Sequence, residues 1–271
     1  MRILFIGDIM GRSGREALET HLPVLREKLS PDVVIVNGEN AAHGKGISPK
    51  ICKGFYDLGV DCITTGNHVW DQREIIPYID KDKKLLRPVN FPDGTPGQGA
   101  YEHQLADGRS ILIVNAMGRL FMDPLDDPFA VVNKLLKERN VNSSNKTIFV
   151  DFHAETTSEK MSFGHHFDGR VSAVIGTHTH VPTADAHVLA GGTAYMTDAG
   201  MSGDYDSVIG VRKEIAVHKF VKKMPGEKFI PAAGPGMLCG AFVVTDDATG
   251  LALSIEPVRV GTGLSETVPG G

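Results

Sequence analysis

Short apolar runs recur along this chain, and many of them end in glycine or polar residues that precede a segment with helical spacing. Runs of this length, bounded by turn residues, are typical of buried strands. We predict strands at residues 2–8, 32–40, 61–68, 110–118, 146–155 and 170–180. Between the first two, Leu18, Leu22, Leu25 and Leu29 share one face of a predicted helix over residues 16–29. This alternation of strands and helices predicts an α/β fold.

The middle of the chain continues this alternation of strands and helices, and the C-terminal part departs from it. Further helices are expected at residues 48–59 and 128–139, and Pro23 is expected to kink or break the first helix. Ser13 is interpreted as a helix N-cap. The C-terminal part is richer in predicted strands, at residues 193–200, 215–221 and 241–260, and the last of these contains the hairpin turn DDATG. We expect one domain over residues 1–271, with a frayed tail from about residue 264.

Composition and charge exclude several classes of function. The 271 residues are 41% apolar and 23% charged, as in ordinary globular proteins. The net charge is −5 and the chain has no run of Lys and Arg, so we do not expect it to wrap duplex nucleic acid. No apolar run has the length of a signal peptide or a membrane span. Cys52, Cys62 and Cys239 fit no zinc or redox spacing, so we expect a reducing compartment, the cytoplasm.

Carboxylate, carboxamide and imidazole side chains follow five of the predicted strands, at the point where each strand ends. These residues are Asp8, Glu39, Asn40, Asn67, His68, His153, His178 and His180. Ligands of open α/β sheets bind outside the carboxyl ends of the strands. His178 and His180 in GTHTH are two residues apart, so their side chains should point the same way. Nitrogen and oxygen ligands without thiolate suit Fe, Mn or Zn, and their number suits two ions that share a bridging carboxylate.

The spacing of these motifs resembles that of the calcineurin-like metallophosphoesterases. The resemblance lies in GNH at residues 66–68, the lone His153, and G-x-H-x-H at residues 176–180. Two motifs depart from the superfamily pattern, because Met10 stands where a histidine is usual and Glu39-Asn40 follows Gly38 in place of an aspartate motif. A narrower group, the YmdB-like bacterial phosphodiesterases, shares these departures. The chain is similar to that group from residue 3 to about residue 235, in stretches such as VNGENAAHGKGI and TTGNHVWDQREI.

The resemblance implies a fold, a cofactor and a role for each site residue. The implied fold is a two-sheet β-sandwich flanked by helices, in α-β-β-α layers, with two metal ions at one edge. Iron is expected, with manganese as the alternative. The resemblance implies that the first ion is bound by Asp8, Asn40 and His180, the second by Asn67, His153 and His178, and both by Glu39. His68 would be the general acid and would not be a ligand.

The implied reaction is hydrolysis of 2′,3′-cyclic nucleotides or related phosphodiesters to 3′-phosphates, by attack of a metal-bridging hydroxide. The expected partners are a small phosphodiester or the ends of RNA, but no membrane, and we expect a homo-oligomer. One alternative is a broader phosphomonoesterase or a nuclease, because the same ions serve these reactions. Another is a regulatory module that binds RNA or protein and keeps the metals for structure. His68 argues against that module, because a structural metal site needs no general acid.

Several residues near these motifs are candidates for further roles, and for two of them the sequence leaves alternatives open. Asp151 either points toward the site, like His153, or is structural. Asp71 and Asp185 are candidates to orient imidazole rings. Trp70 either stacks on a nucleobase or packs under its loop, with packing preferred. His43 and Lys45 are candidates for substrate contact, because they follow Glu39 in a glycine-rich loop.

Overall fold

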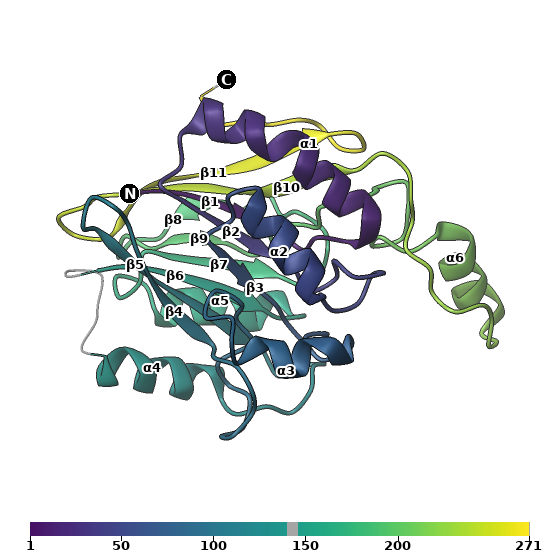
Figure 1. The fold of residues 1–271 in the computed structure, drawn as a ribbon, viewed down its shortest axis with the longest axis horizontal. Coiled ribbons are helices and arrows are strands. Elements are labelled where there is room, and N and C mark those ends of the chain that lie inside the picture. The colour runs from purple at the N-terminus through teal and green to yellow at the C-terminus, as the bar shows by residue number, and fades with distance from the viewer. Residues whose placement is uncertain (140–145, 271) are drawn as a thin grey trace.

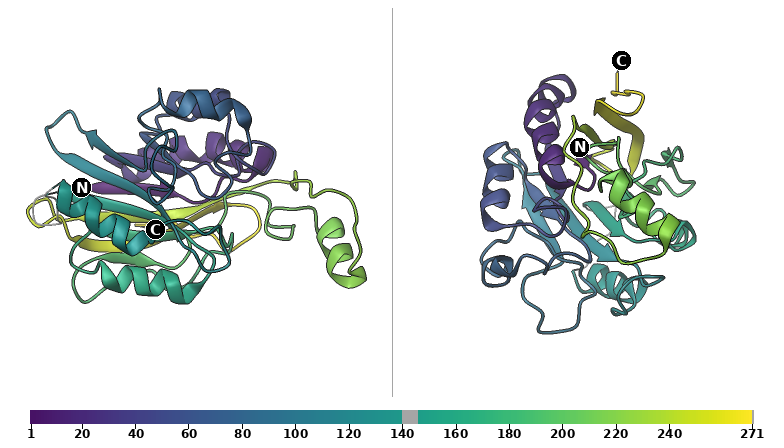
Figure 2. Two further views of the ribbon diagram at one scale, coloured as in Figure 1. Left: turned by 90° about the horizontal axis from the view of Figure 1, so that it is seen from below. Right: turned by 90° about the vertical axis from the view of Figure 1, so that its right-hand side faces the viewer.

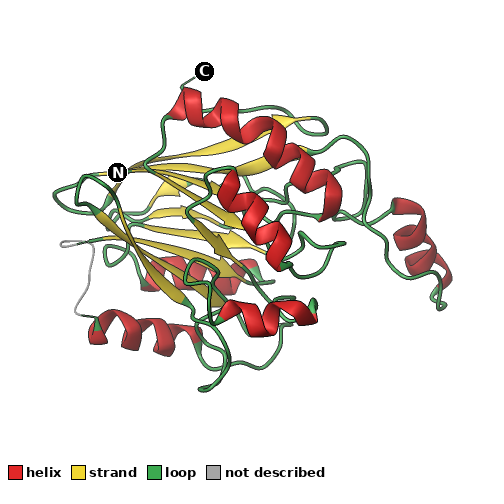
Figure 3. Cartoon of the chain, in the orientation of Figure 1, coloured by secondary structure: helices red, strands yellow, loops and turns green. Residues whose placement is uncertain are grey.

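Two β-sheets lie face to face in the computed structural model, which describes residues 1–139 and 146–270. Helices cover the outer faces of both sheets (Figure 1 and Figure 3). The arrangement confirms the expected α-β-β-α sandwich. Because the domain prediction extends to residue 271, its last residue lies outside the described part of the chain.

The first sheet has the strand order β11-β10-β1-β2-β3. Its strands are β1 (Arg2–Ile6), β2 (Val33–Asn37), β3 (Cys62–Thr64), β10 (Met237–Thr245) and β11 (Ala252–Gly261). β1, β2 and β3 are parallel, whereas β10 is antiparallel to both of its neighbours. The carboxyl ends of the three parallel strands therefore meet at one edge of the sheet.

The second sheet has the strand order β4-β5-β6-β7-β9-β8. Its strands are β4 (Ala100–Gln104), β5 (Ser110–Met117), β6 (Thr147–His153), β7 (Ala173–Thr177), β8 (His187–Val188) and β9 (Ala194–Met196). The four inner strands are parallel, and the two outer strands are antiparallel to their neighbours. The residues that follow β6 and β7 reach the same edge of the sandwich as those that follow β1, β2 and β3.

The helices are distributed over both outer faces (Figure 1). They are α1 (Gly11–Leu29), α2 (Pro49–Asp57), α3 (Ile76–Ile79), α4 (Pro128–Glu138), α5 (Thr157–His166) and α6 (Lys213–Lys222), with a short 3₁₀ helix at Arg73–Ile75. α1 and α2 pack on the first sheet, and α4 and α5 on the second. α6 projects from the body of the molecule on an extended arm (Figure 2). None of the described helices combines the length and apolar character that crossing a bilayer requires.

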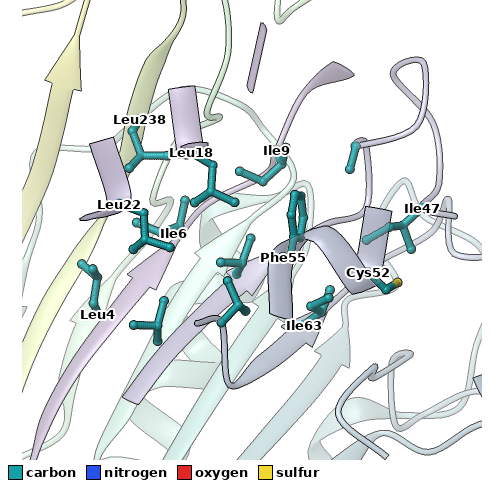
Figure 4. Packing of buried hydrophobic residues seen from close by; sticks show 14 of the residues in the cluster. Leu4, Ile6, Ile9, Leu18, Leu22, Ile47, Cys52, Phe55, Ile63 and Leu238 are labelled. Carbon is teal, nitrogen blue, oxygen red and sulfur yellow. The ribbon is translucent and has the colours of Figure 1, made fainter. Parts of the chain in front are cut away.

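Alternation of apolar side chains along the strands separates the core into layers. In β1, Ile3 and Phe5 face the second sheet, and Phe5 contacts Phe149 with ring centroids 5.1 Å apart. Leu4 and Ile6 face the opposite way, toward the helices (Figure 4). Because every residue of β1 after Arg2 is buried, this part of its sequence is a continuous apolar run. The fully buried strands hold the edge that carries the polar residues in a fixed position.

One predicted element is wrong, and one of the two alternatives for Pro23 is excluded. Residues 215–221 are not a strand but part of α6, because the arm offers this segment no sheet edge to pair with, and a helix satisfies its own backbone groups. The β-branched residues there misled the prediction. Pro23 does not break α1, which is one helix whose four predicted leucines are all buried. The Pro23 ring lies within the helix, and the buried leucines on either side of it stay on one face of α1.

The structure also decides the predicted hairpin turn at DDATG and the predicted N-cap at Ser13. The DDATG turn joins β10 to β11, with Gly250 N–H donating to Asp246 C=O at 2.8 Å, which confirms the hairpin. Ser13 is not an N-cap, because α1 begins at Gly11 and the Ser13 hydroxyl donates to Gly234 C=O. Near the C-terminus, where a frayed tail is expected, Thr267 exchanges two backbone hydrogen bonds with Arg259, at 2.7 and 2.9 Å.

Candidate metal centre

The predicted ligands lie together because their strands end at one edge of the sandwich. Asp8 follows β1, Glu39 follows β2, Asn67 follows β3, His153 ends β6 and His178 follows β7. Gly66, just before Asn67, allows Glu39 and His153 to lie close to the backbone after β3. A Cβ atom on Gly66 would lie 1.9 Å from Glu39 Oε2 and 2.3 Å from the His153 ring. A side chain at position 66 would therefore occupy the space in which these groups converge.

His153 is the centre of a tight polar cluster. Its Nε2 atom lies 3.1 Å from each of Asn67 Oδ1, His178 Nδ1 and Glu39 Oε2. Its other nitrogen lies 2.8 Å from Thr177 Oγ1, which donates in turn to Asp151. The Nδ1–H of His153 therefore donates to Thr177, and a neutral ring presents a lone pair at Nε2.

His178 presents a lone pair to the same point. Its Nε2 lies 3.1 Å from a carboxylate oxygen of Glu155, so the proton belongs on that nitrogen and Nδ1 faces the cluster. Burial lowers the pKa of His178 to about 2, and the neighbouring His153 adds to the effect. Burial also lowers the pKa of His153 to about 4. Both rings are therefore neutral near pH 7, which is the form of imidazole that binds metals.

Asn40 and His180 form a second group beside the first. Asn40 Nδ2 lies 3.0 Å from His180 Nε2, and His180 Nδ1 donates to Ile209 C=O at 2.8 Å. Rotating the Asn40 amide by 180° would bring its oxygen to this position, because the two ends of the amide are nearly the same shape. This pair therefore offers one imidazole nitrogen and one amide oxygen.

Two buried carboxylates lack the hydrogen bonds that burial normally demands. Among the described residues, Asp8 Oδ1 and Glu39 Oε2 are buried oxygens with no hydrogen-bond donor. Burial raises the pKa of Asp8, and it raises the pKa of Glu39 to about 7 against the opposing charges of His68 and His180. Unpaired carboxylate oxygens in such a position cost free energy unless a cation or a proton neutralises them.

These observations fit a bound metal. Glu39, His153 and His178 offer ligand atoms within 4.8 Å of one another, with the Asn67 oxygen beside them. With both rings in the tautomers assigned above, four lone pairs converge at this point, and they repel one another unless a cation or a proton lies between them. The nitrogen and oxygen ligands suit Fe, Mn or Zn. The centre is therefore a candidate metal-binding group.

His68 lies beside this cluster and makes a different contact. Its Nδ1 lies 3.0 Å from a carboxylate oxygen of Asp71, and its side chain is 27% exposed. Asp71 therefore orients an imidazole ring, as predicted. Asp185 does not, since its carboxylate accepts from Thr183 and Thr197.

Asp151 has the structural role. It is fully buried below the site, and its carboxylate accepts hydrogen bonds from Thr64, Thr177 and Asn37 at 2.5, 2.7 and 2.9 Å. Through Thr177 it fixes the ring of His153 from behind. It does not point into the centre.

The loop that carries both histidines of GTHTH is strained and braced. His178 has φ 99° and His180 has φ 67°, a region that side chains other than glycine rarely adopt. Asp198 holds the intervening Thr179 by its N–H at 3.0 Å and its hydroxyl at 2.8 Å. Asp198 is paired with Lys160 at 2.7 Å, and both side chains are buried.

Sequence reasoning missed Glu155, Lys160 and Asp198. Glu155 lies two residues after His153, and this spacing on the chain is the signal that could have indicated it. Lys160 reads as an ordinary charged position on a helix. Only the packing of α5 against β7 brings it to Asp198, so no local pattern reveals it.

A cavity of about 440 Å³ opens above the centre. Its polar side is lined by Glu39, Asn40, His68, Glu155, His178, Thr179 and His180. His43 and Lys45 line it too, which keeps both available for substrate contact. Trp70 packs edge-on against Phe91 with centroids 5.9 Å apart, so the packing interpretation of this residue is the correct one.

Known proteins resemble this chain along nearly its whole length. A 2′,3′-cyclic-nucleotide 2′-phosphodiesterase of Bacillus subtilis is 46% identical over 262 residues, which cover 96% of this chain and 97% of the relative. The crystal structure of a hypothetical protein from Thermus thermophilus has a TM-score of 0.89 and 43% identity, and the match covers 97% of this chain and all of the other.

A further crystal structure, of a novel phosphatase from Mycoplasma pneumoniae, has a TM-score of 0.90 and 36% identity, and the match covers 96% of this chain and 93% of that one. The family model described as YmdB-like protein matches residues 4–258, a range that contains every residue of the candidate centre. The chain therefore belongs to the YmdB-like family.

Proposed function

We propose that this chain is a metal-dependent phosphodiesterase that hydrolyses 2′,3′-cyclic nucleotides, or related diesters such as RNA ends, to 3′-phosphates. The observation that carries the proposal is the convergence of imidazole nitrogens, a carboxylate oxygen and an amide oxygen on one point, below a cavity that His68 also lines. The name of the Bacillus relative supports the choice of substrate.

We assign the ligands of the centre to two ions. The first ion is assigned to Asp8, Asn40 and His180, the second to Asn67, His153 and His178, and Glu39 is assigned to both. Iron is the expected metal and manganese the alternative. When bound, the ions would neutralise the charge of the phosphodiester and would supply a nucleophile at neutral pH. The unpaired oxygens of Asp8 and Glu39 support this assignment, because each needs a cation.

His68 is assigned to protonate the leaving group. Asp71 holds the ring through Nδ1–H, which leaves Nε2 as the nitrogen able to give a proton in the cavity. Hydrolysis forms a bond between phosphorus and a hydroxide derived from water and breaks the bond between phosphorus and the 2′ oxygen. As that bond breaks, the 2′ oxygen takes the proton that a doubly protonated His68 carries on Nε2, and it becomes a hydroxyl group of the ribose. The 3′ oxygen keeps its bond to phosphorus, so the product is a 3′-phosphate.

A broader phosphatase is the second candidate, because the Mycoplasma structure is described as a phosphatase. The phosphodiesterase and the broader phosphatase are distinguished by their products. The iron-loaded protein is incubated with 2′,3′-cyclic AMP and with 3′-AMP, and the products are resolved by chromatography. We expect 3′-AMP from the cyclic substrate and no further hydrolysis. Formation of 2′-AMP would contradict the assigned bond cleavage, and release of inorganic phosphate from 3′-AMP would favour the broader phosphatase.

A further inference from the structure

The cavity above the candidate metal centre has an apolar wall as well as its polar residues. The wall is formed by Met10, Ile209, Val211, Phe229 and Pro231. Phe229 is the one aromatic carbocycle among the described lining residues, and it is 48% exposed. A hydrolytic centre that only needs to bind a phosphate has no use for such a wall, whereas a ligand with a flat apolar part would cover it.

The wall is fixed to the centre. Two segments at the root of the α6 arm pair with each other, since Arg212 N–H donates to Ile230 C=O at 2.9 Å and Ala232 N–H donates to Gly210 C=O at 2.8 Å. The same segment reaches His180, whose Nδ1 donates to Ile209 C=O. Ile209 has φ 47°, a costly conformation for a β-branched residue. The wall is therefore held at a defined position relative to the ligands.

The ring of Phe229 is held on one face and is partly exposed. Lys219 of α6 lies over the ring with its Nζ 4.4 Å from the centroid, a cation–π contact. Because Phe229 lines the cavity and is 48% exposed, a planar ligand in the cavity would stack on the face that Lys219 does not cover. Stacking of a nucleobase on an aromatic side chain tolerates every base, because each base has a π face.

We infer that Phe229 is the stacking platform for the nucleobase of the bound nucleotide, and that the wall around it is the base subsite. This inference rests on the proposed function for the identity of the ligand. The phosphate lies over the metal centre and the base lies against Phe229. The subsite contributes affinity for nucleotides with any of the four bases and discriminates against sugar phosphates that lack a base.

The test measures binding separately from hydrolysis. Metal-loaded wild type and Phe229→Leu are titrated with adenosine 3′-monophosphate and with ribose 3-phosphate in a calorimeter. Loss of one stacked base should raise the Kd of the variant for the nucleotide by roughly 5- to 150-fold. Its Kd for the sugar phosphate should stay within about 2-fold, because the phosphate contacts are unchanged. Phe229→Trp should bind the nucleotide as tightly as the wild type or more tightly.

A matched control is Phe220→Leu, which replaces another aromatic residue under a lysine on the same arm but outside the cavity. It should bind both ligands like the wild type. The inference is overturned if Phe229→Leu weakens both ligands equally, if it weakens neither, or if Phe220→Leu has the same effect. Failure of the proposed function has a separate signature, which is a wild-type protein that binds the nucleotide through Phe229 but does not hydrolyse 2′,3′-cyclic AMP.

Discussion

Glu39 is the residue on which both halves of the proposed centre depend. Its carboxylate is buried, and one oxygen has no hydrogen-bond donor among the described residues. Glu39→Gln keeps the shape of the side chain but removes the charge and one of the ligand oxygens. We expect the variant to lose both metal equivalents. Elemental analysis should show less than half of the wild-type metal, whereas Glu102→Gln on an edge strand should retain all of it.

If Glu39→Gln loses a single equivalent and keeps the other tightly bound, Glu39 is a terminal ligand of one ion and the shared role is wrong.

Asn67 and His68 are neighbours with separable roles. His68→Ala should leave the metal content near that of the wild type and lower kcat for 2′,3′-cyclic AMP by roughly 10²- to 10⁴-fold, the usual contribution of a positioned acid. A nitrophenyl diester, whose leaving group needs no proton, should be affected much less. Asn67→Ala should instead reduce metal occupancy and slow both substrates alike.

Metal analysis and rates on the two substrates decide between these roles. Loss of metal from His68→Ala, or an equal loss of rate on both substrates, would place His68 among the ligands or the supporting residues.

At the scale of elements, the strands and the residues that follow them could be predicted from the sequence. β1, β2, β3, β6 and β7 are short apolar runs, and each delivers its polar residue where the run ends. The contacts behind these residues could not be predicted. Lys160 contacts Asp198 only because α5 packs on the sheet. The sequence of α6 favours a strand, and only the structure shows that this segment lies on an arm with no strand to pair with.

The ion pair between Lys160 and Asp198 should be a major support of the histidine loop. Lys160→Met leaves the buried Asp198 carboxylate without its cation, which costs about 3–5 kcal/mol of unfolding free energy when one partner of a buried pair is removed. Urea denaturation should show this loss. Lys134→Met, at the exposed pair on α4, should change the unfolding free energy by at most about 0.5 kcal/mol.

Equal stability of the Lys160→Met variant and the wild type would show that the hydrogen bonds from Thr179 and Gly200 satisfy Asp198 by themselves.

At the scale of the whole molecule, the sandwich explains why residues from position 8 to position 180 meet at one point. Parallel strands of both sheets end at the same edge, so loops that are far apart in sequence become neighbours. The α/β class and the polar residues that follow the strands could be predicted from the apolar runs, and the layered sandwich from the resemblance to the metallophosphoesterases. The apolar wall at Phe229 could not, because the short segment that carries it, EKFIPAAG, has no periodic pattern that indicates a binding surface.

The central claim is that the convergent ligands at this edge hold two metal ions. The most direct measurement is the number of transition-metal ions per chain in protein purified without oxygen, determined by elemental analysis and compared with activity on 2′,3′-cyclic AMP. We expect two ions per chain, either iron or manganese, with activity lost on chelation and restored as the second equivalent binds. Full activity with one tightly bound ion, or with none, would contradict it.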